Sequence, residues 1–199
     1  MRTIKEKVSL FLALAFRTPW VYFRKELALI KDDGVAMLVK ETMSNIYGRN
    51  FTGPASSSGK YHPAFDRGYG GTARHTKAVV LALTAFQGAY PDKDWDCIYA
   101  AALLHDLAKY EKGNDHSNKN HATVMMNRVH RLVKGNEEIL GKDRSRVELI
   151  ARLIGAHMGR WEKKAHLLPK GFFETDEVKL LHMADMIVSR KWYGTKVIL

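Results

Sequence analysis

The sequence is poor in cysteine, and this scarcity already narrows the class of protein. Cys97 is the only cysteine among 199 residues, so the chain cannot form an internal disulfide. A chain of this size without disulfides fits a reducing compartment, and we therefore expect a cytoplasmic protein. The lack of clustered cysteines also excludes a cysteine-rich zinc finger.

No apolar run is long enough to span a membrane. The apolar stretch of residues 8–16 follows Arg2, Lys5 and Lys7. It falls far below the roughly 18 residues of a membrane-spanning helix. Cleavage after Ala15, at a signal-like site, would leave fewer than the roughly 7 apolar residues that a secretion signal needs. We therefore expect a helix that packs on the core or on a partner, and no membrane association.

Several other signatures are missing. No glycine-rich loop has P-loop spacing, and no serine lies in a nucleophile-elbow pattern. Neither an alternating strand pattern nor an internal repeat is visible, whereas apolar residues recur at helical spacing from Thr72 onward. The pattern predicts an all-α fold, and the length suits one domain.

What the chain does have is an excess of positive charge. Lysine and arginine number 32 against 21 aspartates and glutamates, which gives a formal net charge of +11. This balance favours phosphate-bearing partners, either a nucleotide or single-stranded nucleic acid, although simple solubility is the alternative interpretation.

The chain divides into three segments. Residues 1–50 form a predicted helical segment: a helix over 3–16, a second that opens at Pro19 after Thr18 as N-cap, and a third from Asp32 or Asp33 to about Tyr47. Residues 51–73 form a loop rich in glycine, serine and proline. Since this loop also carries several aromatic and basic side chains, we interpret it as functional rather than as a linker.

Residues 74–199 form the predicted helical core. Turn and cap signals predict helices over 72–88, from Asp92 or Asp94 to Tyr110, from Ser117 or Asn118 to about Val133, from Asp143 or Ser145 through His157, and from Thr175 through Val188.

Within this core, the apolar run of residues 101–110 contains His105 and Asp106 side by side. Burying an imidazole next to a carboxylate is costly, and a divalent metal compensates both groups. The dipeptide alone fits a surface pair or a hydrogen-bonded core histidine equally well. However, further ligand types lie on separate predicted helices with apolar neighbours, namely His75, His121, His157 and Asp185. Histidine nitrogen and carboxylate oxygen together suit Mn, Fe, Co, Ni, Zn or Mg.

The order His75, then Leu103-Leu-His105-Asp106-Leu-Ala-Lys109, then Ala184-Asp185 resembles the HD-domain superfamily of metal-dependent phosphohydrolases, over about residues 60–191. The resemblance implies an HD-domain helical bundle with an N-terminal helical extension. It also implies that His75, His105, Asp106 and Asp185 bind a divalent metal ion. Asp106 would bridge metals or orient the attacking water, and Lys109 would meet a phosphate oxygen.

A narrower resemblance concerns the HD-domain nucleases and phosphodiesterases, including bacterial 3'-5' exoribonucleases. His121 matches an additional histidine of this branch, and His157 matches one member of a histidine pair whose second position is Met158 here. We therefore expect one metal site, and a second through His121 and His157 stays open.

Phosphate and base contacts need further side chains. Each cation near the predicted ligands, taken alone, is better explained as a solvated surface charge, and Arg74 and Lys109 are favoured because they lie about one turn from a ligand. The candidates for phosphate binding are Lys60, Arg74, Lys109, Arg128, Arg160, Arg190 and Lys191. Tyr61, His62 and Trp161 could hold a base or ribose.

The sequence thus predicts a metal-dependent phosphohydrolase of a nucleotide or short nucleic acid, similar to a 3'-5' exonuclease or phosphodiesterase. The alternatives are a dNTP or NMP phosphohydrolase, or a nucleic-acid-binding module with a structural metal. Residues 1–50 could also form a homodimer interface.

Overall fold

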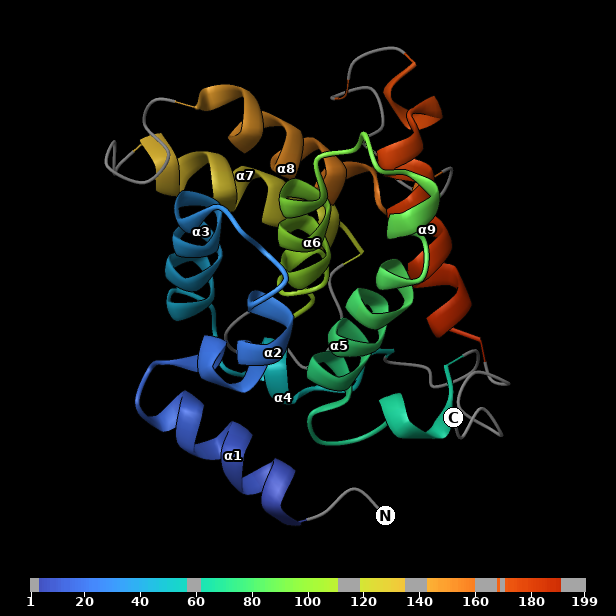
Figure 1. The fold of residues 1–199 in the computed structure, drawn as a ribbon. Coiled ribbons are helices and arrows are strands. Elements are labelled where there is room, and N and C mark those ends of the chain that lie inside the picture. Colours follow the sequence, from blue (N-terminus) through green and yellow to red (C-terminus); the bar gives the residue numbers. More distant parts are fainter. Residues whose placement is uncertain are drawn as a thin grey trace.

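The computed structural model describes residues 4–56, 62–110, 119–134, 143–159, 168 and 171–190. Within these ranges all regular structure is helical and there is no strand, so the all-α prediction is confirmed (Figure 1). The longer helices are α1 (Ile4–Ala15), α3 (Asp33–Ser44), α5 (Gly71–Thr84), α6 (Trp95–Leu104), α7 (His121–Lys134), α8 (Arg144–Ala156) and α9 (Asp176–Val188). Short helical pieces connect them: η1 (Pro19–Phe23), α2 (Arg24–Leu27), α4 (Arg49–Thr52), η2 (Ala64–Asp66), η3 (Gln87–Ala89) and η6 (Phe172–Glu174).

Helix α6 is the centre of the fold. Every residue of this helix except Asp96 is buried. A helix that is apolar all round must be covered on all sides. Helices α3, α5 and α8 pack around it, and Figure 1 shows α6 between them. Its C-terminal end therefore delivers His105 and Asp106 into the protein interior.

Aspartate caps start three of these helices. The side chains of Asp32, Asp94 and Asp143 accept hydrogen bonds from the backbone N–H groups three residues later, at 2.9, 3.1 and 3.2 Å. Each of these bonds satisfies a donor that the first helical turn leaves free. The sequence had suggested two possible cap residues for each of these helices, and the structure shows that Asp32, Asp94 and Asp143 are the caps.

The two threonine caps are placed correctly, but their side chains do not cap. Thr18 precedes η1 and Thr175 precedes α9, and neither hydroxyl accepts a bond from the helix that follows. Each hydroxyl donates instead to an upstream carbonyl, that of Ala13 at 3.5 Å and that of Phe172 at 3.0 Å. These upstream bonds fix the chain direction before each helix.

The helix with the His105-Asp106 pair ends earlier than predicted. It stops at Leu104 rather than continuing to Tyr110, and His105 is its C-cap. The chain then turns, and the buried side chain of Asn50 holds the backbone of Tyr110: Oδ1 accepts from its N–H at 2.7 Å and Nδ2 donates to its C=O at 2.9 Å. This long-range clamp replaces the helical bonds that the sequence pattern suggested.

The predicted loop of residues 51–73 contains the end of α4, all of η2 and, from Gly71 onward, the start of α5. Its other described residues lie against α5 and against the turn after α6. Thr72 donates to the carbonyls of Gly53 and Pro54, both at 3.2 Å, and the hydroxyl of Tyr110 donates to Pro54 at 2.8 Å. The loop therefore joins the first and second parts of the histidine-aspartate pattern.

The N-terminal helices share the core. Leu10, Phe23 and Val39 belong to the same buried apolar cluster as α6. Phe11 on α1 and Phe16 just after it are exposed, and a homodimer through this segment stays a prediction. None of the described helices has the length and apolar character needed to cross a bilayer.

Candidate metal centre

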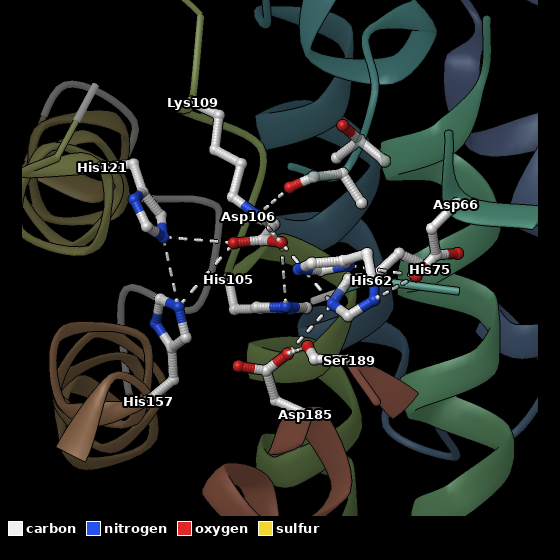
Figure 2. Close-up of polar contacts among 12 residues, drawn as sticks. His62, Asp66, His75, His105, Asp106, Lys109, His121, His157, Asp185 and Ser189 are labelled. Atoms are coloured by element: carbon white, nitrogen blue, oxygen red, sulfur yellow. Dashed lines mark hydrogen bonds and ion pairs between the residues drawn. The ribbon is translucent and has the colours of Figure 1, made fainter. Parts of the chain in front are cut away.

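Six side chains that are far apart in sequence meet in the interior (Figure 2). All are buried except one carboxylate, which belongs to Asp185 and is 15% exposed. They come from five helices or helix ends: His75 from α5, His105 and Asp106 from the end of α6, His121 from the start of α7, His157 from the end of α8, and Asp185 from α9. The structure thus brings together all six predicted ligands, and metal binding by each of them stays a prediction.

The first set of contacts lies on one side of Asp106. Nε2 of His75 is 3.0 Å from Oδ1 of Asp185 and 3.6 Å from Oδ2 of Asp106. Nε2 of His105 is 3.5 Å from the same Oδ2 atom. Two imidazole nitrogens and two carboxylates therefore face a common point.

The second set uses the other oxygen of Asp106. Oδ1 lies 3.1 Å from Nε2 of His121 and 3.7 Å from Nε2 of His157. The two histidine nitrogens are 3.3 Å apart. Asp106 therefore stands between two nitrogen sets and turns one oxygen toward each.

Two of the histidines are oriented by the same device. Nδ1 of His105 donates to the carbonyl of Ala102, and Nδ1 of His157 donates to the carbonyl of Ile154, both at 2.7 Å. A carbonyl only accepts, so each Nδ1 carries a proton. In the neutral imidazole this tautomer leaves Nε2 with a lone pair for a metal ion.

The donor set fits a divalent cation. Nε2 of His105 is buried and has no hydrogen-bond partner among the described residues. An unsatisfied polar atom in the interior is costly unless something coordinates it. Ligand atoms of His75, His105 and Asp185 all lie within 4.8 Å of one another, and so do those of His105, Asp106 and His157. This mixture of nitrogen and oxygen suits first-row divalent metals or magnesium.

Burial and the neighbouring carboxylates both shift the pKa values of the site residues. Burial lowers the pKa of His75, but hydrogen bonds to Asp185 and Asp66 outweigh that effect and raise the pKa to about 10. In the case of Asp185, burial disfavours the charged form, yet the hydrogen bond from His75 holds the carboxyl pKa well below its usual range. Without a metal, a proton on His75 therefore partly balances the carboxylates.

The pKa of His157 is shifted in the opposite direction from that of His75. Burial, followed by the neighbouring His105 and His121 imidazoles, lowers its pKa to about 3. A histidine must be neutral to bind a metal. Burial therefore keeps His157 ready as a ligand at neutral pH.

Lys109 lies against the central carboxylate. Its Nζ forms a short contact with Oδ2 of Asp106 and donates to the carbonyl of Ala55 at 2.7 Å. The ammonium thus balances a buried negative charge and ties it to the loop. Its predicted role at a phosphate oxygen stays a prediction.

A comparison with protein families decides the classification. The family model of the HD domain matches residues 72–189, which is more than half of the chain and includes all six side chains of the site. The chain belongs to the HD-domain family. A search of curated proteins and a search of solved structures give no significant match. The family is typically hydrolytic, and the match does not select a branch within it.

This HD domain contains a buried acidic residue, Asp66, that the sequence analysis did not identify as part of the site. Asp66 has no exposed surface, and its Oδ2 lies 3.1 Å from Nδ1 of His75 and 3.3 Å from Nδ1 of His62. The only sequence signal was an acid shortly before the glycine pair that opens the His75 helix. Loop acids of that kind are common, so the signal is weak.

The predicted substrate-binding residues have varied surroundings. The guanidinium of Arg74 donates to the loop carbonyls of Phe65, Tyr69 and Arg67 at 2.5, 2.7 and 3.0 Å. The structure thus gives Arg74 a role in shaping the loop, and its predicted phosphate contact is untested. His62 contacts Asp66 as described above.

The other substrate-binding predictions are also open. Arg128 is half-buried on α7, and Arg190 is exposed just after α9. The remaining predicted residues lie outside the described residues: Lys60, Tyr61, Arg160, Trp161 and Lys191.

Proposed function

We propose that this HD domain is a metal-dependent phosphohydrolase that cleaves a phosphoester bond in a nucleotide or a short nucleic acid, and that its buried histidines and aspartates would hold two divalent ions, one on each side of Asp106. The observation that carries the proposal is the position of Asp106, with one carboxylate oxygen toward His75 and His105 and the other toward His121 and His157.

Each side of Asp106 has its own ligands. On one side His75, His105 and Asp185 would hold one ion. On the other side the His121–His157 pair would hold the second. Met158 stands where the nucleases that this chain resembles have a histidine. His121 and His157 still offer two nitrogens to the second ion. Bound there, divalent ions lower the pKa of a coordinated water and stabilise the attacking and leaving oxygens of a phosphoryl group.

The protein side chains prepare the site for this chemistry. Lys109 balances the charge of Asp106 and fixes the orientation of its carboxylate. The histidine side chains are buried, and a low local dielectric strengthens electrostatic interactions with a developing negative charge. The exposed edge of Asp185 marks a side on which a substrate phosphate could approach. The net charge of +11 favours such an anionic substrate.

Two alternatives predict different results. A dNTP or NMP phosphohydrolase would use the same ligands but would prefer a mononucleotide. A nucleic-acid-binding module with a structural metal would bind the metal and the nucleic acid without turnover.

The test is a substrate panel offered to the full chain loaded with Mn²⁺, and to the Asp106→Ala variant. The panel contains dNTPs, NMPs, single-stranded RNA, single-stranded DNA and bis-p-nitrophenyl phosphate. Metal contributes several kcal/mol to such reactions, so loss of Asp106 should reduce hydrolysis by about 100-fold or more. Preference for an oligonucleotide supports the nuclease branch, and preference for a mononucleotide supports the first alternative. No turnover of any substrate by a folded, metal-loaded chain would reject the enzymatic proposal.

A further inference from the structure

One buried carboxylate serves two histidines next to the metal centre. Oδ2 of Asp66 lies 3.1 Å from Nδ1 of His75 and 3.3 Å from Nδ1 of His62, and Figure 2 shows both rings turned toward it. The two ring centroids are 5.3 Å apart. Asp66 has no exposed surface, His75 none, and the side chain of His62 is 14% exposed. The three residues thus run from the metal ligand toward the edge of the site.

The backbone bonds of the loop around Asp66 do not involve its carboxylate. The loop backbone already has its bonds: the carbonyl of Asp66 accepts from Ala55 at 3.0 Å, and its N–H donates to Pro63 at 3.1 Å. Arg74 holds three further carbonyls of the same segment. The side chain of Asp66, by contrast, contacts the histidines, and its Oδ1 has no hydrogen-bond partner among the described residues.

Burying such a carboxylate is expensive unless it is paired. A role toward His75 explains why it is there. A carboxylate that accepts from one ring nitrogen of histidine fixes the tautomer and the ring angle, and makes the other nitrogen a better metal ligand. In His75 that other nitrogen is Nε2, which faces Asp185 and Asp106.

The chain packs tightly around this acid. A Cβ atom on Gly71 would collide with the backbone oxygen of Asp66 and would come within 2.8 Å of the Cα atom of Pro54. Glycine therefore lets the start of α5 approach the loop closely enough for Asp66 to reach His75, which lies one turn further along the same helix.

From these contacts we infer that Asp66 is a positioning residue, which holds His75 in the orientation and tautomer that bind metal and holds His62 beside it at the edge of the site. This inference rests on the proposed function only in that His75 is taken to be a metal ligand. It requires no particular substrate.

The test measures metal binding without turnover. The dissociation constant for Zn²⁺ is determined by competition with a chromophoric chelator for the full-length chain, Asp66→Ala, Asp66→Asn and Asp32→Ala. Loss of an orienting carboxylate typically weakens metal binding by about 10–100-fold, and we expect this for Asp66→Ala. Asp66→Asn keeps the shape but loses the charge, and we expect a loss of about tenfold.

Asp32→Ala is the matched control. It removes a cap from α3, a helix without a ligand, and should lower the melting temperature while leaving the Zn²⁺ affinity unchanged. A second readout is the Nδ1 proton of His75 in the NMR spectrum of the Zn²⁺-loaded protein. This proton should exchange slowly with water in the native chain and rapidly in Asp66→Ala, which a merely structural role would not predict.

Native Zn²⁺ affinity in either folded Asp66 variant would overturn the inference. If Asp66→Ala does not fold, Asp66→Asn decides alone. Failure of the proposed function is separate: a chain that hydrolyses nothing but loses Zn²⁺ affinity on Asp66→Ala keeps the inference. A chain that shows metal-dependent hydrolysis and unaltered affinity in both variants keeps the function and loses the inference.

Discussion

Oδ1 of Asp106 lies 3.1 Å from Nε2 of His121, while Oδ2 of the same carboxylate faces a different pair of histidines. A carboxylate shared in this way can contact two ions at once. If Asp106 holds two ions in this way, a mutation should remove one ion without the other, because His121 and His157 face only one of its two oxygens.

Replacing His121 by alanine should therefore remove one ion and leave the other. We expect the metal content of the folded protein to fall from about two to about one divalent ion per chain, and hydrolysis to fall by about 100-fold. Elemental analysis after removal of unbound metal gives the stoichiometry, and bis-p-nitrophenyl phosphate gives the rate.

The matched control for this change is His130→Ala. His130 lies on the same helix but pairs with Glu148 at the surface, 2.9 Å away. Its loss should affect neither metal content nor rate. Equal metal content in His121→Ala and the native chain would contradict the two-ion arrangement.

Metal binding should strengthen as the pH rises through neutrality. Burial lowers the pKa of His75, but its bonds to Asp185 and Asp66 prevail and raise it to about 10, so the metal-free protein carries a proton there at neutral pH. The ion has to displace that proton. Apparent affinity should thus rise about tenfold per pH unit between about pH 6 and pH 8, with release of about one proton.

Calorimetry in buffers of different ionisation enthalpy measures the released proton, and chelator competition at each pH measures the affinity. The pH dependence of the chelator itself is determined in parallel. A flat affinity over this range, without proton release, would show that His75 is already neutral before the metal binds.

Substitution of Gly71 by alanine should disturb the loop that carries Asp66. The added Cβ would meet the backbone of Asp66 and Pro54 rather than a flexible side chain. Overpacking of this kind costs about 1–3 kcal/mol in the free energy of unfolding. Denaturant unfolding of the metal-free protein measures that cost, and Zn²⁺ affinity should fall with it.

Gly88→Ala is the comparison for this substitution. A Cβ at Gly88 meets no atom within 4 Å. The free energy of unfolding of the Gly88→Ala variant should therefore stay within about 0.5 kcal/mol of the native value or rise slightly. If the two alanine variants are equally stable, the tight contact at Gly71 is not present in solution.

Arg146 should contribute to stability and not to the metal centre. Its guanidinium binds the capping carboxylates of Asp32 and Asp94, each at 2.9 Å, and so links the starts of α3, α6 and α8. Lysine cannot reproduce this fork, and Arg146→Lys should lower the free energy of unfolding by about 1 kcal/mol with unchanged Zn²⁺ affinity. Lys179→Ala, which loses an exposed pair with Glu174, should have almost no effect. Equal stability of the two variants would argue against a linking role for Arg146.

The sequence predicted the parts of this molecule that depend on local pattern. Helical spacing and aspartate caps predicted the core helices, because both signals act within a few residues. The order of His75, His105-Asp106 and Asp185 led to the HD domain, which the family match confirms. Each predicted ligand lies on a helix beside apolar residues. Because these apolar faces must all pack into one core, the ligands were expected to meet there.

What the sequence did not predict depends on contacts between distant polar groups. The helix of the His105-Asp106 pair ends at Leu104, and further along the turn the side chain of Asn50 binds the backbone of Tyr110. Asp66 reaches His75 only because the intervening loop folds back on itself. The sequence suggested Arg74 as a phosphate ligand, and it did not show that three of the guanidinium donors bind carbonyls of that same loop. Such pairings have no periodic signature.

Metal-dependent hydrolysis is tested by a titration of the metal-free chain with Mn²⁺, in which bound metal and hydrolysis of bis-p-nitrophenyl phosphate are followed in the same samples. We expect the metal-free chain to be inactive and the rate to rise steeply as the second of about two ions binds. Full activity of the metal-free chain, or none after two ions have bound to a folded protein, would contradict this expectation.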